Sequence, residues 1–172
     1  ITIFSKQAVL SLSGCEFTLV DTPGHVDFSP EMERTLQILD YAILVINGSD
    51  GVQSHTDTLW RLVRQHNIPT FLFINKMDLT EGKHNALMDQ LTRKLSDHCV
   101  DFSSGADHED AQDKLAMCAE NLMEEYLSEG IISTDSIRKA IANNDVFPCM
   151  FGSALKLQGI TEFLDILTAF TL

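Results

Sequence analysis

Long apolar runs and paired cysteines are both missing from this chain of 172 residues. No stretch reaches 18 apolar residues, so the sequence predicts no membrane-spanning helix and no membrane partner. The four cysteines are scattered and form no Cys-x-x-Cys pair. This pattern indicates free thiols in a reducing cytosol, and neither a disulfide framework nor a zinc site. We therefore expect a cytoplasmic location.

Basic residues are also scarce, since 12 Lys and Arg stand against 25 Asp and Glu, for a net charge of −13. Such a charge argues against this domain binding nucleic acid by itself, because contacts to phosphate need Lys and Arg. The acidic residues concentrate in 97–129. They form either a solvated surface or a docking face for a basic partner, and the sequence leaves both interpretations open.

The chain has no internal repeat and no low-complexity tract, and 44% of its residues are hydrophobic. A chain of this length and composition can bury one core, so we expect one domain. Residues 17–20 are expected to form a buried strand. Apolar and alternating runs predict strands at 1–12, 16–21, 41–46, 70–74 and 147–151, the first two joined as a hairpin.

Helices are expected between most of these strands, where apolar residues recur at helical spacing. Ser29 can cap the first of them, with Pro30 in its first turn. Ser54, with Asp57 three residues on, resembles a capping box at the start of the second. The other helices are predicted from Leu87, Leu91 and Leu95, from Leu115, Ala119, Leu122 and Tyr126, from Ile137 and Ile141, and from the apolar residues after Gly159.

The alternation of strands and helices predicts an α/β fold with a mostly parallel sheet, flanked by helices and joined by right-handed crossovers. Residues 100–145 interrupt this alternation. We interpret them as a small helical insertion within the domain and not as a second domain.

Polar loops follow three of the predicted strands. They are Asp21-Thr22-Pro23-Gly24, followed by His25, then Asn75-Lys76-Met77-Asp78, and finally Gly152-Ser153-Ala154. An open α/β sheet places its ligand at the carboxyl ends of its strands. An acidic residue with a glycine suits a phosphate and its magnesium ion, whereas a paired amide and carboxylate suit the edge of a nucleobase. Three such loops in this order make coincidence unlikely, and they predict a nucleotide site.

These motifs resemble those of the translational GTPases, most closely elongation factor G and the tetracycline-resistance ribosomal protection proteins. Residues 21–28 are similar to the second switch of that family, and Ile1-Thr2-Ile3 to the tail of its first switch. Residues 75–78 resemble its guanine-specificity loop, and Ser153-Ala154 the loop that closes over the base. The resemblance implies a P-loop-NTPase-like fold, GTP or GDP with Mg²⁺ as cofactors, the ribosome as partner, and GTP hydrolysis.

On the phosphate side, the resemblance implies that Thr2 and Asp21 hold the magnesium ion. Thr22 and Pro23 belong to the same nucleotide-binding loop. Gly24 brings its backbone N–H to the γ-phosphate, an approach that the lack of a Cβ makes easy. His25 occupies the place of the catalytic residue that orients the attacking water, a role compatible with general-base chemistry or with charge stabilisation.

On the base side, the resemblance implies that Asp78 accepts two hydrogen bonds from guanine. Asn75 braces the loop and meets the other edge of the base, and Lys76 lays its stem over the ring. Ser153 and Leu155 flank Ala154, whose N–H donates to guanine O6. Leu155 stands where the family often has Lys or Phe, and this change leaves the backbone contact intact.

A phosphate loop of the form Gly-x-x-x-x-Gly-Lys-Ser/Thr occurs nowhere in the sequence. In the family this loop, its strand and its helix precede the first switch, and this chain begins at Ile1. We therefore expect residues 1–172 to be a G domain truncated at its N-terminus, without the first strand and helix, and incompetent for hydrolysis by itself. Unpaired strand edges should be filled by rearrangement or by a second chain in a dimer, since buried unpaired backbone is costly.

Two functional hypotheses remain open at this point. The first is a ribosome-dependent GTPase, either an elongation factor G-like factor or a ribosomal protection protein. The short segment between Asn75 and Ser153 favours the protection proteins, whereas residues 122–127 resemble elongation factor G. The second is a non-catalytic, ribosome-binding module that keeps the G-domain fold without turnover.

Overall fold

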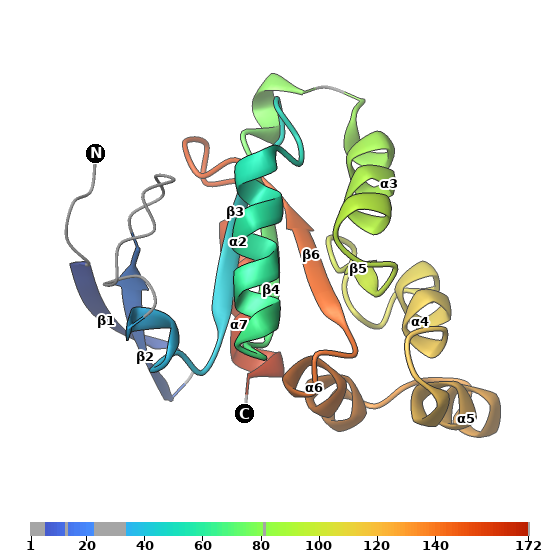
Figure 1. Cartoon of the computed structure of the whole chain (residues 1–172). Helices are drawn as coiled ribbons and strands as arrows, with labels where there is room; N and C mark the ends of the chain where they lie inside the picture. The colour runs from blue at the N-terminus through green and yellow to red at the C-terminus, as the bar shows by residue number, and fades with distance from the viewer. Residues whose placement is uncertain (1–5, 13, 23–33, 81, 172) are drawn as a thin grey trace. The chain divides into compact units, whose positions relative to one another are not determined.

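The computed structural model describes residues 6–12, 14–22, 34–80 and 82–171. The chain divides into two compact units, Ile1–Asp40 and Tyr41–Leu172, and the second holds most of the helices and strands (Figure 1).

The first unit contains a β-hairpin. Strands β1 (Lys6–Leu12) and β2 (Cys15–Asp21) pair antiparallel, with Lys6 opposite Asp21 and Leu12 opposite Cys15, which confirms the predicted hairpin. The expectation that 17–20 are buried is wrong, because Leu19 is 41% exposed. A two-stranded ribbon covers little of either face, so an apolar run in it is not buried as it would be inside a larger sheet. The helix predicted to begin at Ser29 starts outside the described residues.

The second unit is built on a four-stranded parallel sheet. Its strands are β3 (Ala42–Asn47), β4 (Thr70–Asn75), β5 (Cys99–Asp101) and β6 (Phe147–Phe151), in the spatial order β3-β4-β6-β5. The parallel α/β fold predicted from the sequence is confirmed. Strand β5 was not predicted, because three residues are too few to show a period.

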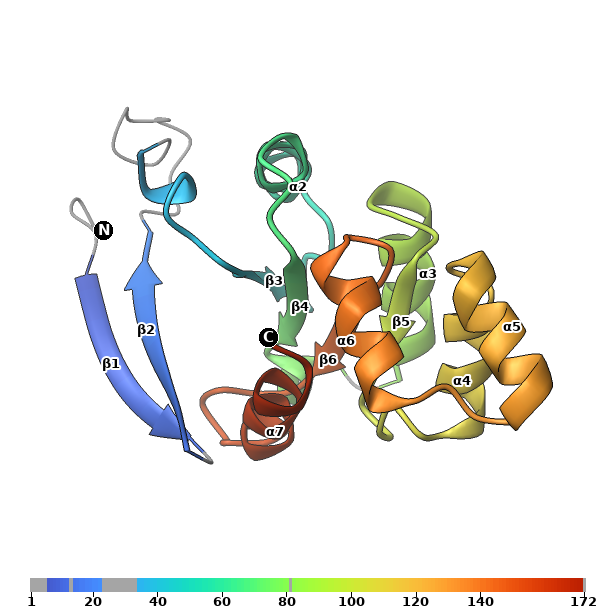
Figure 2. The same cartoon turned by 90° about the horizontal axis from the view of Figure 1, so that it is seen from below.

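Helices cover both faces of this sheet. Helices α2 (Ser54–Gln65) and α3 (His84–Lys94) lie on one face, and α7 (Ile160–Phe170) lies on the other (Figure 2). Alternate residues of the strands point to opposite faces. Phe73 therefore meets Phe163 of α7, with ring centroids 5.0 Å apart, and Phe147 meets Trp60 of α2 at 4.8 Å.

Three helices lie between β5 and β6 in the chain, namely α4 (Glu109–Ala116), α5 (Glu120–Glu129) and α6 (Thr134–Ala142). The single helix predicted from Leu115 to Tyr126 is wrong. The helix breaks because Ala119 is extended, with φ of −154°, and serves as the N-cap of α5. The buried residues of these helices share one core with the sheet and α7. Gln112 reinforces this packing, since its buried amide donates to the Ala106 carbonyl and accepts from the Ile132 N–H.

The predicted capping box of α2 is also wrong. Gln53 is the N-cap and makes no side-chain cap hydrogen bond, so Ser54 is already helical. Asp57 instead forms an ion pair with Arg61 one turn later, at 2.9 Å. A side-chain cap is present at α6, where the Ser133 hydroxyl accepts from the Ser136 N–H.

All four cysteines are free thiols, as the sequence predicted. Cys15 is exposed and the other three are buried. Burial raises the pKa of Cys118 to about 11 and the pKa of Cys149 well above its ordinary value, so neither forms a thiolate near neutral pH. Within the part of the chain that the structure describes, no helix is both long and apolar enough to cross a membrane.

Leu115 tests whether the three inserted helices belong to the main core. Leu115→Ala should lower the free energy of unfolding by about 2–5 kcal/mol, because the side chain is fully buried in the shared cluster. Urea unfolding followed by the fluorescence of Trp60 measures this loss. The control Met117→Ala removes a side chain that is 63% exposed and should cost no more than about 0.5 kcal/mol. Equal costs for the two variants would mean that Leu115 contributes nothing to the core.

Candidate functional site

The loops predicted to form the base side of a nucleotide site lie at one edge of the sheet in the second unit. The carboxyl ends of β3, β4 and β6 are aligned there, since Asn47 pairs in register with Asn75, and Ile74 with Phe151. Backbone hydrogen bonds then join the loops themselves. The Gly48 N–H donates to the Asn75 carbonyl at 2.8 Å, and the Met77 N–H donates to the Gly152 carbonyl at 3.0 Å.

Asn75 connects the two predicted base loops through its side chain. Its Oδ1 accepts from the N–H of Lys76 at 2.8 Å and from the N–H of Ala154 at 2.9 Å. A residue at the end of β4 thus holds the backbone of a loop 79 positions later in the chain. The bracing role given to Asn75 stays a prediction as far as nucleotide is concerned, but this geometry is what such a role needs.

Lys76 and Asp78 sit in a tight turn after β4. Lys76 has φ of 65°, in the left-handed region, and is the N-cap of the short 3₁₀ helix η1 (Met77–Leu79). This conformation reverses the chain, leaving Lys76 exposed and Asp78 half-buried. Among the described residues, no side chain or N–H pairs with the Asp78 carboxylate, so both of its oxygens are open to a ligand that donates hydrogen bonds.

The loop after β6 is rigidly built around Gly152 and Ser153. A Cβ on Gly152 would lie 2.3 Å from the Gln158 carbonyl oxygen and 2.9 Å from Phe73, so only glycine fits there. Ser153 is buried, and its N–H donates to the Gln158 carbonyl at 2.9 Å. These contacts present the Ala154 N–H at the edge of the sheet, beside Asn75, while the Leu155 residue is 86% exposed.

The residues predicted for the phosphate side fall in the first unit. Asp21 is the last residue of β2 and is exposed, and Thr22 follows it. Thr2, Pro23, Gly24 and His25 lie outside the described residues. The exposed carboxylate of Asp21 suits a hard cation such as Mg²⁺, which keeps several of its waters and takes one or two carboxylates from the protein. Over residues 6–12, 14–22, 34–80 and 82–171, no three His, Cys, Asp or Glu residues form a metal cluster.

Two supporting residues at the base loops were not singled out from the sequence. Gly48 lies so close to the turn after β4 that a Cβ there would be 2.9 Å from the Met77 sulfur. Gln158 closes the loop after β6 through two backbone hydrogen bonds with Ser153. The sequence signals were weak, since Gly48 is one glycine in a polar loop and Gln158 acts only through its backbone.

The bridge made by Asn75 can be tested without ligand. Asn75→Ala should make the Ala154 amide exchange its hydrogen about 5- to 10-fold faster, because a hydrogen bond of ordinary strength is lost. Exchange of the Ala154 signal, followed by NMR, measures the effect. Asn47→Ala is the matched control, because Asn47 ends the neighbouring strand and, among the described residues, its side chain bonds to Ser49 and Asp50 of its own loop and to no other loop. Unchanged exchange at Ala154 in the Asn75 variant would show that the bridge does not hold the loop.

Known proteins share both the sequence and the fold of this chain. The family model of the elongation factor Tu GTP binding domain matches residues 1–171. Elongation factor G of Mycoplasma genitalium is 31% identical over 217 residues, and elongation factor G of Ureaplasma parvum is 30% identical over the same length. Each alignment covers 99% of this chain and 32% of the relative, so the chain spans about a third of their length.

A crystal structure of a protein from Thermus thermophilus has the same fold. It superposes with a TM-score of 0.82 at 18% sequence identity, over 99% of this chain and 32% of that one. The parallel sheet, the order of the loops at its edge and the match over nearly every residue agree with one another. This chain therefore belongs to the family of the elongation factor Tu GTP binding domain.

Proposed function

We propose that this chain serves as the guanine-nucleotide-binding domain of a ribosome-dependent translational GTPase similar to elongation factor G. The observation that carries the proposal is the meeting of Asn75, Asp78 and Ala154 at one edge of the parallel sheet. That edge presents an open carboxylate beside a backbone N–H, and this pair matches the donors and the acceptor on one edge of guanine.

Base selectivity follows from the chemistry of Asp78. The two carboxylate oxygens can accept from the N1–H and the exocyclic amine of guanine. Adenine offers no such pair of donors, so it would leave a half-buried carboxylate unpaired. The Ala154 N–H donates to O6. This N–H now donates to Asn75 Oδ1, so on binding guanine it either divides its hydrogen bond between the two acceptors or leaves Asn75 for O6. Lys76, exposed beside the turn, lies over the ring, and Ser153 and Leu155 frame the loop.

The phosphate side is assigned to the first unit and the residues around it. Thr2 and Asp21 would hold Mg²⁺, which neutralises charge on the phosphates during phosphoryl transfer. Gly24 would meet the γ-phosphate with its N–H, next to Thr22 and Pro23. His25 would orient the attacking water. We propose residues 1–172 as one partial G domain, with 100–145 as a helical insertion within it.

A ribosomal protection protein is the second candidate. The elongation factor G relatives align over 217 residues, whereas this whole chain has 172, so they carry additional residues inside the matched region. A shorter insertion is the feature that favours the protection proteins. A non-catalytic ribosome-binding module would share the base site but would not need His25.

The 172-residue chain by itself is proposed to be inactive, because its sequence holds no phosphate-loop motif. In the described part of the second unit, β3 hydrogen bonds to β4 on one side and to no strand on the other. Ile43 and Val45 of this strand are exposed. An edge of this kind supports pairing with another strand, supplied by the complete protein or, in the isolated chain, by rearrangement or a second copy.

Base selectivity provides the main test. In the complete protein, Asp78→Asn should weaken GTP binding by about 2–4 kcal/mol, because one charge-assisted hydrogen bond is lost and an amide donor faces the guanine amine. Xanthosine triphosphate carries a carbonyl in place of that amine, so the preference should invert. Competition titration with both nucleotides measures this preference as the ratio of the two affinities. Asp89→Asn, an exposed carboxylate on α3, is the control and should change neither affinity. Equal loss of both nucleotides would mean that Asp78 does not read the base.

Catalysis provides a separate test. In the complete protein, His25→Ala should leave the Kd for GTP within a few fold and lower ribosome-stimulated hydrolysis by roughly 10²-fold or more, the usual cost of losing a positioned catalytic group. Single-turnover hydrolysis with and without ribosomes measures the loss of turnover, and titration with GTP measures the Kd. Comparable losses of binding and turnover would make His25 a structural residue. Unchanged turnover would show that hydrolysis does not use this histidine, and wild-type protein without ribosome-stimulated turnover would favour the non-catalytic module.

A further inference from the structure

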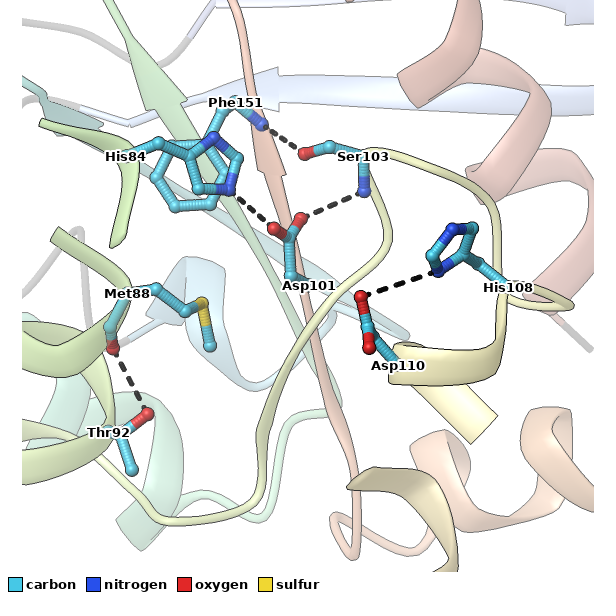
Figure 3. Close-up of polar contacts among 8 residues, drawn as sticks. All are labelled: His84, Met88, Thr92, Asp101, Ser103, His108, Asp110 and Phe151. Carbon is cyan, nitrogen blue, oxygen red and sulfur yellow. Dashed lines mark hydrogen bonds and ion pairs between the residues drawn. The ribbon is translucent and has the colours of Figure 1, made fainter. Parts of the chain in front are cut away.

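A network of polar contacts joins α3, the end of β5 and the end of β6 (Figure 3). His84, the first residue of α3, is hydrogen bonded through Nε2 to Asp101 Oδ2, and its ring stacks on Phe151 with centroids 3.9 Å apart. The other Asp101 oxygen accepts from the Ser103 N–H at 2.9 Å. The Ser103 hydroxyl in turn accepts from the Phe151 N–H at 3.3 Å. The contacts therefore form a closed ring between α3, the end of β5 and the end of β6.

Ser103 continues the sheet where β5 stops. The ladder between β5 and β6 ends with Asp101 opposite Cys149, and the Phe102 N–H still donates to the Cys149 carbonyl. Further along β6, the Phe151 N–H donates to the Ser103 hydroxyl and not to a backbone carbonyl. The last residue of β6 is thus held on both sides, by Ser103 here and by pairing with Ile74 of β4.

The position of this ring matters because one base loop begins right after Phe151, and the other lies between β4 and the helix that His84 begins. Phe151 immediately precedes Gly152, and through it the loop that presents the Ala154 N–H. His84 begins the helix that follows the turn carrying Asp78. The stacking of His84 on Phe151 therefore joins the start of α3, which follows the Asp78 turn, to the end of β6, which precedes the Ala154 loop. Asp101 and Ser103 also lead into the three inserted helices, so the same ring joins that part of the chain to the base loops.

We propose that His84 and Asp101 are positioning residues that set the guanine pocket, acting through Phe151 and Ser103. This inference rests on the guanine site proposed above. Neither side chain touches the base; they hold the two loops that do. Their own side chains are 38% and 32% exposed, so the pair is not part of the core on which folding depends.

A second His–Asp pair nearby provides a matched control. His108 lies just before α4 and pairs with Asp110 at 3.7 Å (Figure 3), and within the described part of the chain its side chain forms no hydrogen bond or ion pair with β6. His108→Ala removes the same side chain from a similar pair on the inserted helices. It should alter neither base loop.

The test compares nucleotide release and base selectivity in the complete protein. His84→Ala and Asp101→Ala should each speed dissociation of fluorescent GDP by about 5- to 10-fold. The double variant should release GDP no faster than the faster single variant, because the two groups act as one unit. The affinity ratio of GDP to inosine diphosphate, which lacks the exocyclic amine, should fall in the same variants. His84→Phe keeps the stacking on Phe151 without the hydrogen bond and should fall between wild type and His84→Ala. His108→Ala should stay within about 2-fold of wild type.

The outcomes separate this inference from the proposed function. Wild-type protein that does not prefer GDP over inosine diphosphate would overturn the guanine site itself. A guanine-selective wild type whose selectivity and release are unchanged in His84→Ala, or are changed equally in His108→Ala, would overturn the positioning role alone. If His84→Ala does not fold, Ser103→Ala and His84→Phe decide the matter by the same two measurements. Loss of affinity with an unchanged selectivity ratio would assign the network to general stability and overturn the proposal.

Discussion

Complete burial of β4 is the constraint on which the rest of the second unit depends. Phe71, Leu72 and Ile74 have no exposed surface, because helices cover both faces of this strand and β3 and β6 pair with both edges. Polar side chains are therefore excluded from the interior of this strand and can be placed only at its end, where the backbone leaves the sheet. Asn75 stands at that point, and its polar side chain becomes the support for two loops. The position of the proposed base site thus follows from the burial of the strand before it.

The inserted helices are part of the same construction. Leu115, Leu122 and Ile141 pack in one cluster with Met150 and Phe163, so α4, α5 and α6 share the core of the sheet and α7. Apolar side chains from separate segments shield one another from water in this cluster, so the insertion and the sheet stabilise one another. The ring formed by His84, Asp101, Ser103 and Phe151 lies where the segment leading into these helices leaves the sheet. Phe151 connects this ring to the loop that follows β6.

Much of this architecture could be predicted from the sequence. Strands β4 and β6 are largely apolar runs, and their predicted bounds differ from the observed ones by no more than one residue. The features that could not be predicted depend on contacts between distant segments. Strand β5 is recognised by its pairing with β6, and the break before α5 lies at the extended Ala119, between two helices that both bury leucines in one core. Spacing along a single helix gives the same pattern for one helix or two.

The sequence by itself determined the order of the loops, the residue types in them and the family to which the chain belongs, because these are properties of short contiguous segments. Only the tertiary structure decided which groups meet. The Ala154 N–H bonds to an asparagine 79 positions away, and the His84 ring stacks on a phenylalanine that no local pattern connects with it. Such contacts depend on strand register and on helix packing against the sheet. Both are settled by burial of the whole unit and not by any one segment.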